Sequence, residues 1–329
     1  MKQSLRVLLL VCGPKPDDIT ASHGTFADYL HRAVEPYWKN AVAAAATIRC
    51  AAAGASAINL LPTISYMTVN VFDDDMPESD RAPDQPRTEM PLSRLFRDPA
   101  VTSVPFDAII LSGSKYNVTE GRPFVGKVQA WIAEKCVAQK PTPPWVFGIC
   151  FGHQLLADHF AGRGAVVVNS KGPELGSHEC RLTAAAEGDP LWRVARLTTR
   201  GSVEDIGQTT DSASSSSSTF LANELHYETV ARVKPSDAGA GDEKGLAAAS
   251  SVVVLANSAA DHHQCVRWRP HIYSVQFHPE YSATFMRDTV PFLHMNDKAE
   301  EARVMASIQP TPLSESLVAS FLALCAFSR

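Results

Sequence analysis

The sequence predicts an α/β protein with three layers, in which a doubly wound, mostly parallel central sheet carries helices on both faces. Two observations predict this fold. Short apolar runs alternate with helical patterns through the first half of the 329-residue chain, and this alternation is typical of parallel strands joined by helices. After Ala161 the apolar pieces become shorter and less regular, which indicates that antiparallel strands are also present.

The first half holds four expected strands, at Val7–Cys12, Ile64–Phe72, Ala108–Leu111 and Val146–Ile149, and three expected helices, near Thr25–Tyr37, Phe124–Ala138 and Phe151–Ala161. The first run is short for the core of a signal peptide and ends at Gly13-Pro14, so we expect a buried strand there. The second half holds shorter expected strands, at Ala165–Val168, His178–Thr183, Val252–Ala256 and Ile272–Phe277, followed by a helical stretch from Ser282.

We expect a single domain over residues 1–296, with insertions near 41–56, 77–105, 204–222 and 236–246, and a C-terminal extension over 297–329. The Ala-rich segment Ala41–Ser56 favours a surface helix extension, and the six prolines of Pro77–Pro105 favour an irregular loop. The serine run Ser214–Ser218 lacks the apolar side chains that a core needs. The stretch Leu317–Phe327 is apolar enough to form a docking helix.

Composition narrows the classes of partner. The formal net charge is −5 and no block of Lys or Arg occurs, which argues against nucleic acid and against an anionic membrane surface as main partners. No window approaches the roughly 18 apolar residues of a membrane span. Seven scattered cysteines without a C-x-x-C pair indicate a reducing compartment. We therefore expect a cytoplasmic protein.

A cysteine flanked by glycines follows the fourth expected strand. In Gly148-Ile-Cys150-Phe-Gly152 the glycines remove Cβ atoms that would clash in a sharp turn from strand to helix. A thiol in the first turn of a helix lies near the positive end of the helix dipole, and we expect this to lower the pKa of Cys150. The N–H of Phe151 is positioned to help hold an oxyanion. A buried, unreactive cysteine is the alternative for so short a pattern.

A second pattern pairs a histidine with a carboxylate. The strand Ile272–Phe277 is followed by His278-Pro279-Glu280. Side chains at i and i+2 of an extended chain project to the same side, so Glu280 can hold one imidazole nitrogen while the other accepts the proton of a thiol. A histidine at a strand end beside an exposed glutamate is the alternative.

The third pattern is the turn Ser112-Gly113-Ser114, which follows the strand Ala108–Leu111. Its backbone N–H groups fall at the carboxyl edge of the predicted sheet, where they can supply the other half of an oxyanion hole. An ordinary glycine turn is the alternative.

These three segments together resemble the class I, triad-type glutamine amidotransferases. The resemblance rests on Ser112-Gly113-Ser114, Gly148-Ile-Cys150-Phe-Gly-His-Gln154 and Gln276-Phe-His278-Pro-Glu280, in this order and each at a strand end. Weaker similarity covers Gly172–Ser177, Asp189-Pro-Leu and His226–Val230, where Glu228 stands in place of the family's Asp. Within the family the chain looks most like stand-alone amidotransferase-like and γ-glutamyl peptidase proteins.

The resemblance implies the flavodoxin-like fold of that family and a triad. Cys150 would attack the side-chain amide of glutamine or another γ-glutamyl compound, His278 would move the protons, and Glu280 would orient His278. Water would then hydrolyse a γ-glutamyl thioester. Glutaminase activity that supplies ammonia to a synthetase partner is the first implied function, and cleavage of γ-glutamyl peptides such as glutathione-like conjugates is the alternative.

The resemblance also implies roles around the triad, which are oxyanion binding at Gly113 and Phe151 and lining of the glutamyl pocket by Ser114 and Gln154. We expect no cofactor and no metal ion. The segment Asp261-His-His-Gln-Cys265 resembles a metal cluster only superficially, since adjacent histidines point apart on a strand. Asp73–Asp75 is expected to be a solvated loop, His153 a packing or interface residue, and His226 a residue at the rim of the site or in a structural hydrogen bond.

Two further interpretations stay open. A binding or regulatory module could keep the fold without turnover, and the long insertions and the apolar stretch Leu317–Phe327 favour it. An α/β-hydrolase with a cysteine nucleophile shares the sharp turn, but it predicts an acid that precedes the histidine in sequence. Here the best carboxylate follows the histidine by two residues.

Overall fold

The computed structural model describes residues 1–49, 61–72, 90–91, 105–137, 142–200, 218–234, 252–259, 262–293, 295 and 297–328. Within them, a ten-stranded mixed sheet has the order β3-β2-β1-β4-β5-β12-β11-β10-β7-β8. Its strands are β1 (Ser4–Val11), β2 (Thr63–Asn70), β3 (Met90–Pro91), β4 (Ala108–Leu111), β5 (Trp145–Ile149), β7 (Glu174–Leu182), β8 (Thr219–His226), β10 (Val253–Ser258), β11 (His263–Arg269) and β12 (Ile272–Val275).

The sheet has a parallel half and an antiparallel half. Neighbours from β3 through β12 are parallel, and neighbours from β12 through β8 are antiparallel. A separate antiparallel pair is formed by β6 (Val166–Val168) and β9 (Glu228–Val230). The predicted change from parallel to mixed pairing after Ala161 is confirmed.

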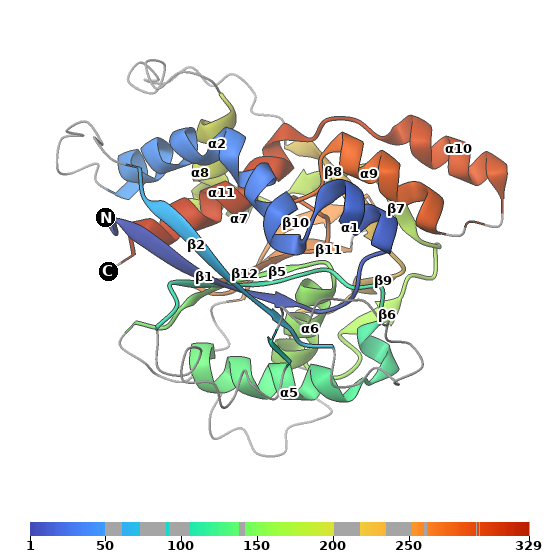
Figure 1. Cartoon of the computed structure of the whole chain (residues 1–329), viewed down its shortest axis with the longest axis horizontal. Coiled ribbons are helices and arrows are strands. Elements are labelled where there is room, and N and C mark those ends of the chain that lie inside the picture. Colours follow the sequence, from blue (N-terminus) through green and yellow to red (C-terminus); the bar gives the residue numbers. More distant parts are fainter. Residues whose placement is uncertain are drawn as a thin grey trace.

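Helices cover both faces of the sheet (Figure 1). One face carries α2 (Phe26–Arg49), α8 (Pro190–Thr199) and α11 (Pro312–Ala326), and the other carries α5 (Pro123–Ile132) and α6 (Phe151–Ala161). Each face of the sheet has its own hydrophobic core, and β1 contributes side chains to both. Leu5, Val7 and Leu9 belong to one core, and Leu8 and Leu10 belong to the other. The predicted three-layer fold is confirmed.

The remaining helices are short or peripheral. They are α1 (Asp17–His23), the 3₁₀ turn η3 (Val118–Glu120), the π-helical turn η4 (Ala133–Val137), α7 (Ala184–Gly188), α9 (Ala283–Thr289), the 3₁₀ turn η8 (Val290–Leu293) and α10 (Lys298–Ser307). None of the helices in the described ranges is both long and apolar enough to cross a bilayer.

The structure describes parts of two expected insertions and differs from the expectation in each. The stretch from Ala41 to Arg49 is no surface extension, because it completes α2 and Ala41, Val42, Ala44 and Ala45 are fully buried. The insertion expected near 204–222 ends too late, because Thr219–Ala222 already pairs with β7. The segments 50–60, 73–89, 92–104, 201–217 and 235–251 lie outside the described residues, and with them Asp73–Asp75, the run Ser214–Ser217 and the expected insertion at 236–246.

The apolar C-terminal stretch belongs to the core. In α11 the side chains from Leu317 to Ala326 are all buried, and the helix packs on α2, α8 and the sheet (Figure 1). Leu317, Phe321 and Leu324 share one hydrophobic cluster with β1 and β5. The expected docking helix therefore packs on its own domain. The prediction that this apolar stretch forms an interface with a partner is wrong.

Candidate active site

Cys150 lies on a sharp turn between β5 and α6. Its backbone has φ 50° and ψ −101°, and among the described residues it is the one non-glycine with a positive φ. The turn needs its two glycines. A Cβ on Gly148 would come within 2.7 Å of the Gly152 backbone, and a Cβ on Gly152 within 2.6 Å of Leu111. Backbone strain held by close packing is typical of functional positions.

The Cys150 thiol is buried and held among carbonyl and charged groups. Its Sγ lies 3.8 Å from the carbonyl oxygen of Leu225, and its N–H donates to the Val275 carbonyl over 2.8 Å. Burial, followed by the charge of Glu280, raises the pKa of Cys150 to about 12, against a smaller lowering by Lys15. The expectation of a lowered pKa is wrong, because desolvation outweighs the charge of Lys15 and the hydrogen bond from the Phe151 N–H. The resting thiol therefore needs a base.

His278 and Glu280 form a buried pair at the end of β12. The His278 Nδ1 lies 2.9 Å from Glu280 Oε1, and both side chains are almost fully buried. The backbone N–H of His278 donates to the Asn223 carbonyl over 2.8 Å, which ties the pair to β8. The opposite ring nitrogen, Nε2, has no hydrogen-bond partner among the described residues. That nitrogen is available to accept a proton.

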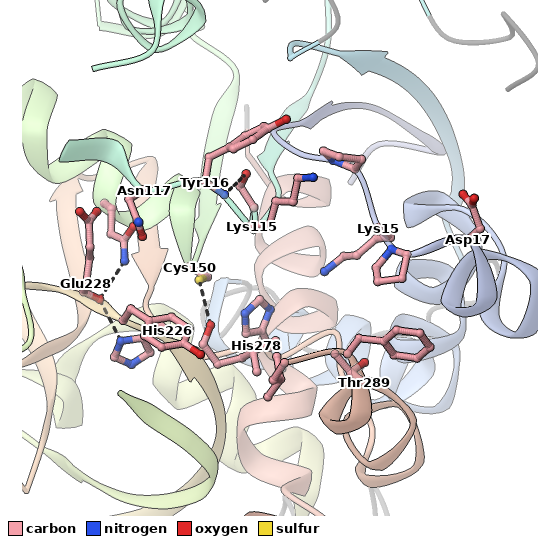
Figure 2. A pocket seen from close by; sticks show the side chains of 18 residues that line it. Lys15, Asp17, Lys115, Tyr116, Asn117, Cys150, His226, Glu228, His278 and Thr289 are labelled. Carbon is pink, nitrogen blue, oxygen red and sulfur yellow. Dashed lines mark hydrogen bonds between the residues drawn. The ribbon is translucent and has the colours of Figure 1, made fainter. Parts of the chain in front are cut away.

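Gly113 brings the thiol and the imidazole together. A Cβ on Gly113 would lie 2.7 Å from Cε1 of His278 and 3.5 Å from Cβ of Cys150. The Cys150 Cβ and the His278 ring therefore both lie beside Gly113, which has no side chain to keep them apart. Figure 2 shows both among the side chains that line one cavity. In this arrangement the imidazole can take the thiol proton and the carboxylate can hold the imidazolium.

The turn after β4 is fixed to the end of β1. The Ser112 hydroxyl accepts from the Cys12 N–H over 2.9 Å and donates to the Gly113 carbonyl over 2.7 Å. The Ser114 hydroxyl donates to the Cys12 carbonyl over 2.9 Å and accepts from the Tyr116 N–H. These bonds hold the Gly113 backbone beside Cys150. Ser114 therefore holds the turn in place and also lines the cavity.

Gln154 lines the cavity one helical turn after Cys150. Its side-chain amide donates to the Glu228 carbonyl over 2.9 Å and to Gln276 over 3.3 Å. The Glu228 carboxylate accepts from the Val118 N–H over 2.9 Å and from the Thr119 hydroxyl. Glu228 thus fixes η3 and the cavity wall that precedes it.

Two histidines near the site have different surroundings. His153 is fully buried, with hydrogen bonds to Ser274 and to the His263 carbonyl, and burial lowers its pKa to about 3. It is a packing residue, as expected. His226 lines the cavity and faces oxygens at both nitrogens, the Glu228 carbonyl at 2.9 Å and the Glu224 carboxylate at 3.0 Å. Burial lowers the pKa of His226, but the adjacent Glu224 carboxylate outweighs burial and raises it overall.

The cavity over Cys150 and His278 has a volume of about 650 Å³. Its walls come from the loop after β1, the loop after β4, the end of β8 and the helical turn η8 (Figure 2). This volume lies within the range of small-molecule sites. Within the described ranges, no group of three or more His, Cys, Asp or Glu side chains could hold a metal ion.

A comparison with protein families decides the membership of this chain. The model of the family "Glutamine amidotransferase class-I" matches residues 93–297, which include β4, β5, β12 and the whole constellation at Cys150. The chain belongs to the class I glutamine amidotransferase family. No curated protein matches the chain.

Solved structures show the same amidotransferase fold at low sequence identity. One is a glutamine amidotransferase from Thermotoga maritima, with 15% identity, a TM-score of 0.50 and coverage of 98% of this chain and 99% of that one. Another is a candidate GMP synthase component from Thermoplasma acidophilum, with 15% identity, a TM-score of 0.50 and coverage of 99% of this chain and 96% of that one. The flavodoxin-like fold expected of this family is confirmed.

The structure brings all seven amidotransferase site residues expected from the sequence to one place. Cys150, His278, Ser114 and Gln154 line the cavity, Glu280 lies behind His278, and Gly113 and Phe151 flank the thiol. Sequence reasoning missed Lys15, Asn223 and Tyr281. A lysine just after the first strand was a usable signal, because that position falls at the carboxyl edge of the sheet. Asn223 and Tyr281 offered none, since their contacts depend on how β8 packs against the loop after β12.

Proposed function

We propose that this amidotransferase domain hydrolyses the side-chain amide of glutamine and releases ammonia. The observation that carries the proposal is the convergence of the Cys150 thiol and the His278 imidazole across Gly113, with Glu280 2.9 Å behind the imidazole. A nucleophile, a base and an orienting carboxylate in this order make up an acyl-transfer site.

The first half of the reaction forms a thioester. His278 Nε2 takes the Cys150 proton as the sulfur attacks the γ-carbonyl carbon, and the carbonyl oxygen becomes an oxyanion beside the backbone of Gly113 and Phe151. The imidazolium, held by Glu280, then gives its proton to the nitrogen of the leaving group. Ammonia departs, and the γ-glutamyl group stays on the sulfur.

The second half regenerates the thiol. His278 removes a proton from a water molecule, the hydroxide attacks the thioester carbonyl, and the sulfur leaves with the proton returned by His278. Glutamate is the product. We propose a synthetase that consumes the ammonia as the partner, and Ser114 and Gln154 as residues of the glutamyl pocket. A cytoplasmic location is in keeping with the free thiols of Cys12, Cys150, Cys180, Cys265 and Cys325.

The size of the cavity favours a second candidate, a γ-glutamyl peptidase. A volume of about 650 Å³ leaves room beside the thiol for a leaving group larger than ammonia. The same chemistry cleaves a γ-glutamyl peptide, because only the amine that accepts the proton from His278 differs.

The test is hydrolysis of glutamine and of γ-glutamyl dipeptides by the purified protein, beside Cys150→Ala and His278→Ala. Release of ammonia or of the amino acid by the wild type, and its loss in both variants, is the expected result. Preference for dipeptides would select the second candidate. Equal turnover by wild type and Cys150→Ala would refute the role of Cys150, and a stable wild type without turnover of any γ-glutamyl compound would favour a non-catalytic module.

A further inference from the structure

Lys15 lies in a loop near the N-terminus, far in sequence from Cys150 and His278, and this loop forms part of the candidate site. The loop follows β1 at the carboxyl edge of the sheet, and Lys15 stands between Pro14 and Pro16. Each proline fixes its own φ and restricts the preceding residue to an extended backbone, so the direction of the lysine is set by its neighbours. Its side chain lines the cavity, and Figure 2 shows it pointing inward toward His278.

The ammonium of Lys15 contacts the aromatic ring that supports His278. It donates a hydrogen bond to the Tyr281 hydroxyl and lies 4.8 Å from the centroid of the Tyr281 ring. The Tyr281 ring in turn stacks on the His278 imidazole, with centroids 4.2 Å apart and an angle of 4° between the planes. The lysine charge therefore lies at the hydroxyl end of the ring whose face supports the proposed base.

The charges around the thiol need a compensating cation. Glu280 is buried and its Oε2 has no hydrogen-bond partner among the described residues. Glu280 and Glu224 both disfavour a negative charge on Cys150, whereas Lys15 favours it. Burial lowers the pKa of Lys15 overall, and the charges of Glu280 and Cys150 oppose this lowering and favour the ammonium. Tyr281 and Tyr29 are further titratable neighbours, with ring centroids 5.9 Å apart.

We infer that Lys15 is a positioning residue of the site, whose ammonium offsets the Glu280 carboxylate and so stabilises the Cys150 thiolate as its proton passes to His278. Transfer of the proton leaves a thiolate and an imidazolium and does not change the net charge. With Lys15 present, the lysine and Glu280 cancel before and after the step. Without it, the sulfur ionises next to an uncompensated carboxylate. This inference rests on the proposed nucleophilic role of Cys150.

Alkylation of Cys150 by iodoacetamide tests this inference without substrate. The rate is measured between pH 7 and 9 from the mass of the Cys150 peptide, for the wild type, Lys15→Met, Lys15→Gln and Lys15→Arg. Iodoacetamide is uncharged, so the lysine cannot change the rate by attracting the reagent. Loss of one nearby opposite charge shifts a pKa by about one unit or more, so we expect both neutral variants to react about tenfold more slowly at each pH, and Lys15→Arg to keep most of the wild-type rate.

The matched control is Lys115→Met, which removes a lysine from another wall of the same cavity, where its ammonium lies 5.5 Å from the Tyr116 ring. Its alkylation should follow the wild-type pH curve. Superimposed curves for wild type, Lys15→Gln and Lys15→Met would overturn the inference, as would equal slowing by Lys115→Met. Thermal unfolding verifies that the variants fold. A wild type whose Cys150 is alkylated but which hydrolyses no γ-glutamyl compound would refute the proposed function. The comparison of alkylation rates would still test the role of Lys15.

Discussion

Substitution of Gly113 by alanine isolates the geometry of the thiol and the imidazole. The new methyl group would lie 2.7 Å from Cε1 of His278, whereas ordinary contact begins at 3.4 Å. The ring must therefore retreat by roughly 0.7 Å, and a misplacement of about 1 Å in an active site costs on the order of 10²-fold in rate. The backbone N–H at Gly113 is kept, so the proposed oxyanion contact is not removed.

We expect Gly113→Ala to lower kcat for γ-glutamyl hydrolysis by about 10²-fold, which corresponds to about 2.7 kcal/mol. The variant should stay folded, because the neighbour that must move is a side chain that lines a cavity and not packed backbone. The assay is release of ammonia or of the amino acid under saturating substrate, together with thermal unfolding of the same preparation.

The chain offers a matched glycine as control. Gly126 lies exposed inside α5, and a Cβ there would meet nothing within 4 Å. Gly126→Ala should keep wild-type activity and raise stability by roughly 0.5–1 kcal/mol, since alanine is the better helix former. Wild-type activity in Gly113→Ala would mean that the observed position of His278 is not the one used in the reaction.

Three other substitutions test separate parts of the structure. Glu280→Gln should lower kcat by about 10²-fold or more with little change in KM, and steady-state kinetics equal to wild type would contradict an orienting role. Because the pKa of His226 is raised, its contribution to stability is complete below about pH 6.5 and declines as pH rises through the folded-state pKa. Glu224→Gln should flatten this decline, measured as the free energy of urea unfolding from pH 6 to 9. An unchanged slope of stability against pH would exclude the His226–Glu224 pair as its cause. Gly148→Ala places a Cβ 2.7 Å from the Gly152 backbone and should destabilise the fold by about 1–3 kcal/mol, which wild-type urea unfolding of the variant would disprove.

The strands of the parallel half could be predicted because their side chains are apolar along the whole strand, which by itself indicates a buried strand. Ala108–Leu111 and Phe151–Ala161 were predicted with the bounds that the structure has, since a fully buried strand is apolar throughout and a helix after a glycine turn has a clear start. The strand β8 was missed because it holds buried polar residues, Asn223 and Glu224, whose partners come from distant elements.

The sequence by itself determined the fold class, the family and the order of the chemical groups at Cys150, Gly113 and His278, because strand ends, glycine turns and the i, i+2 spacing are local properties. Only the tertiary structure decided the protonation of the Cys150 thiol, the place of α11 in the core and the approach of Lys15 to Tyr281. Burial and charge at a point in space are sums over segments far apart in sequence, so no local pattern contains them.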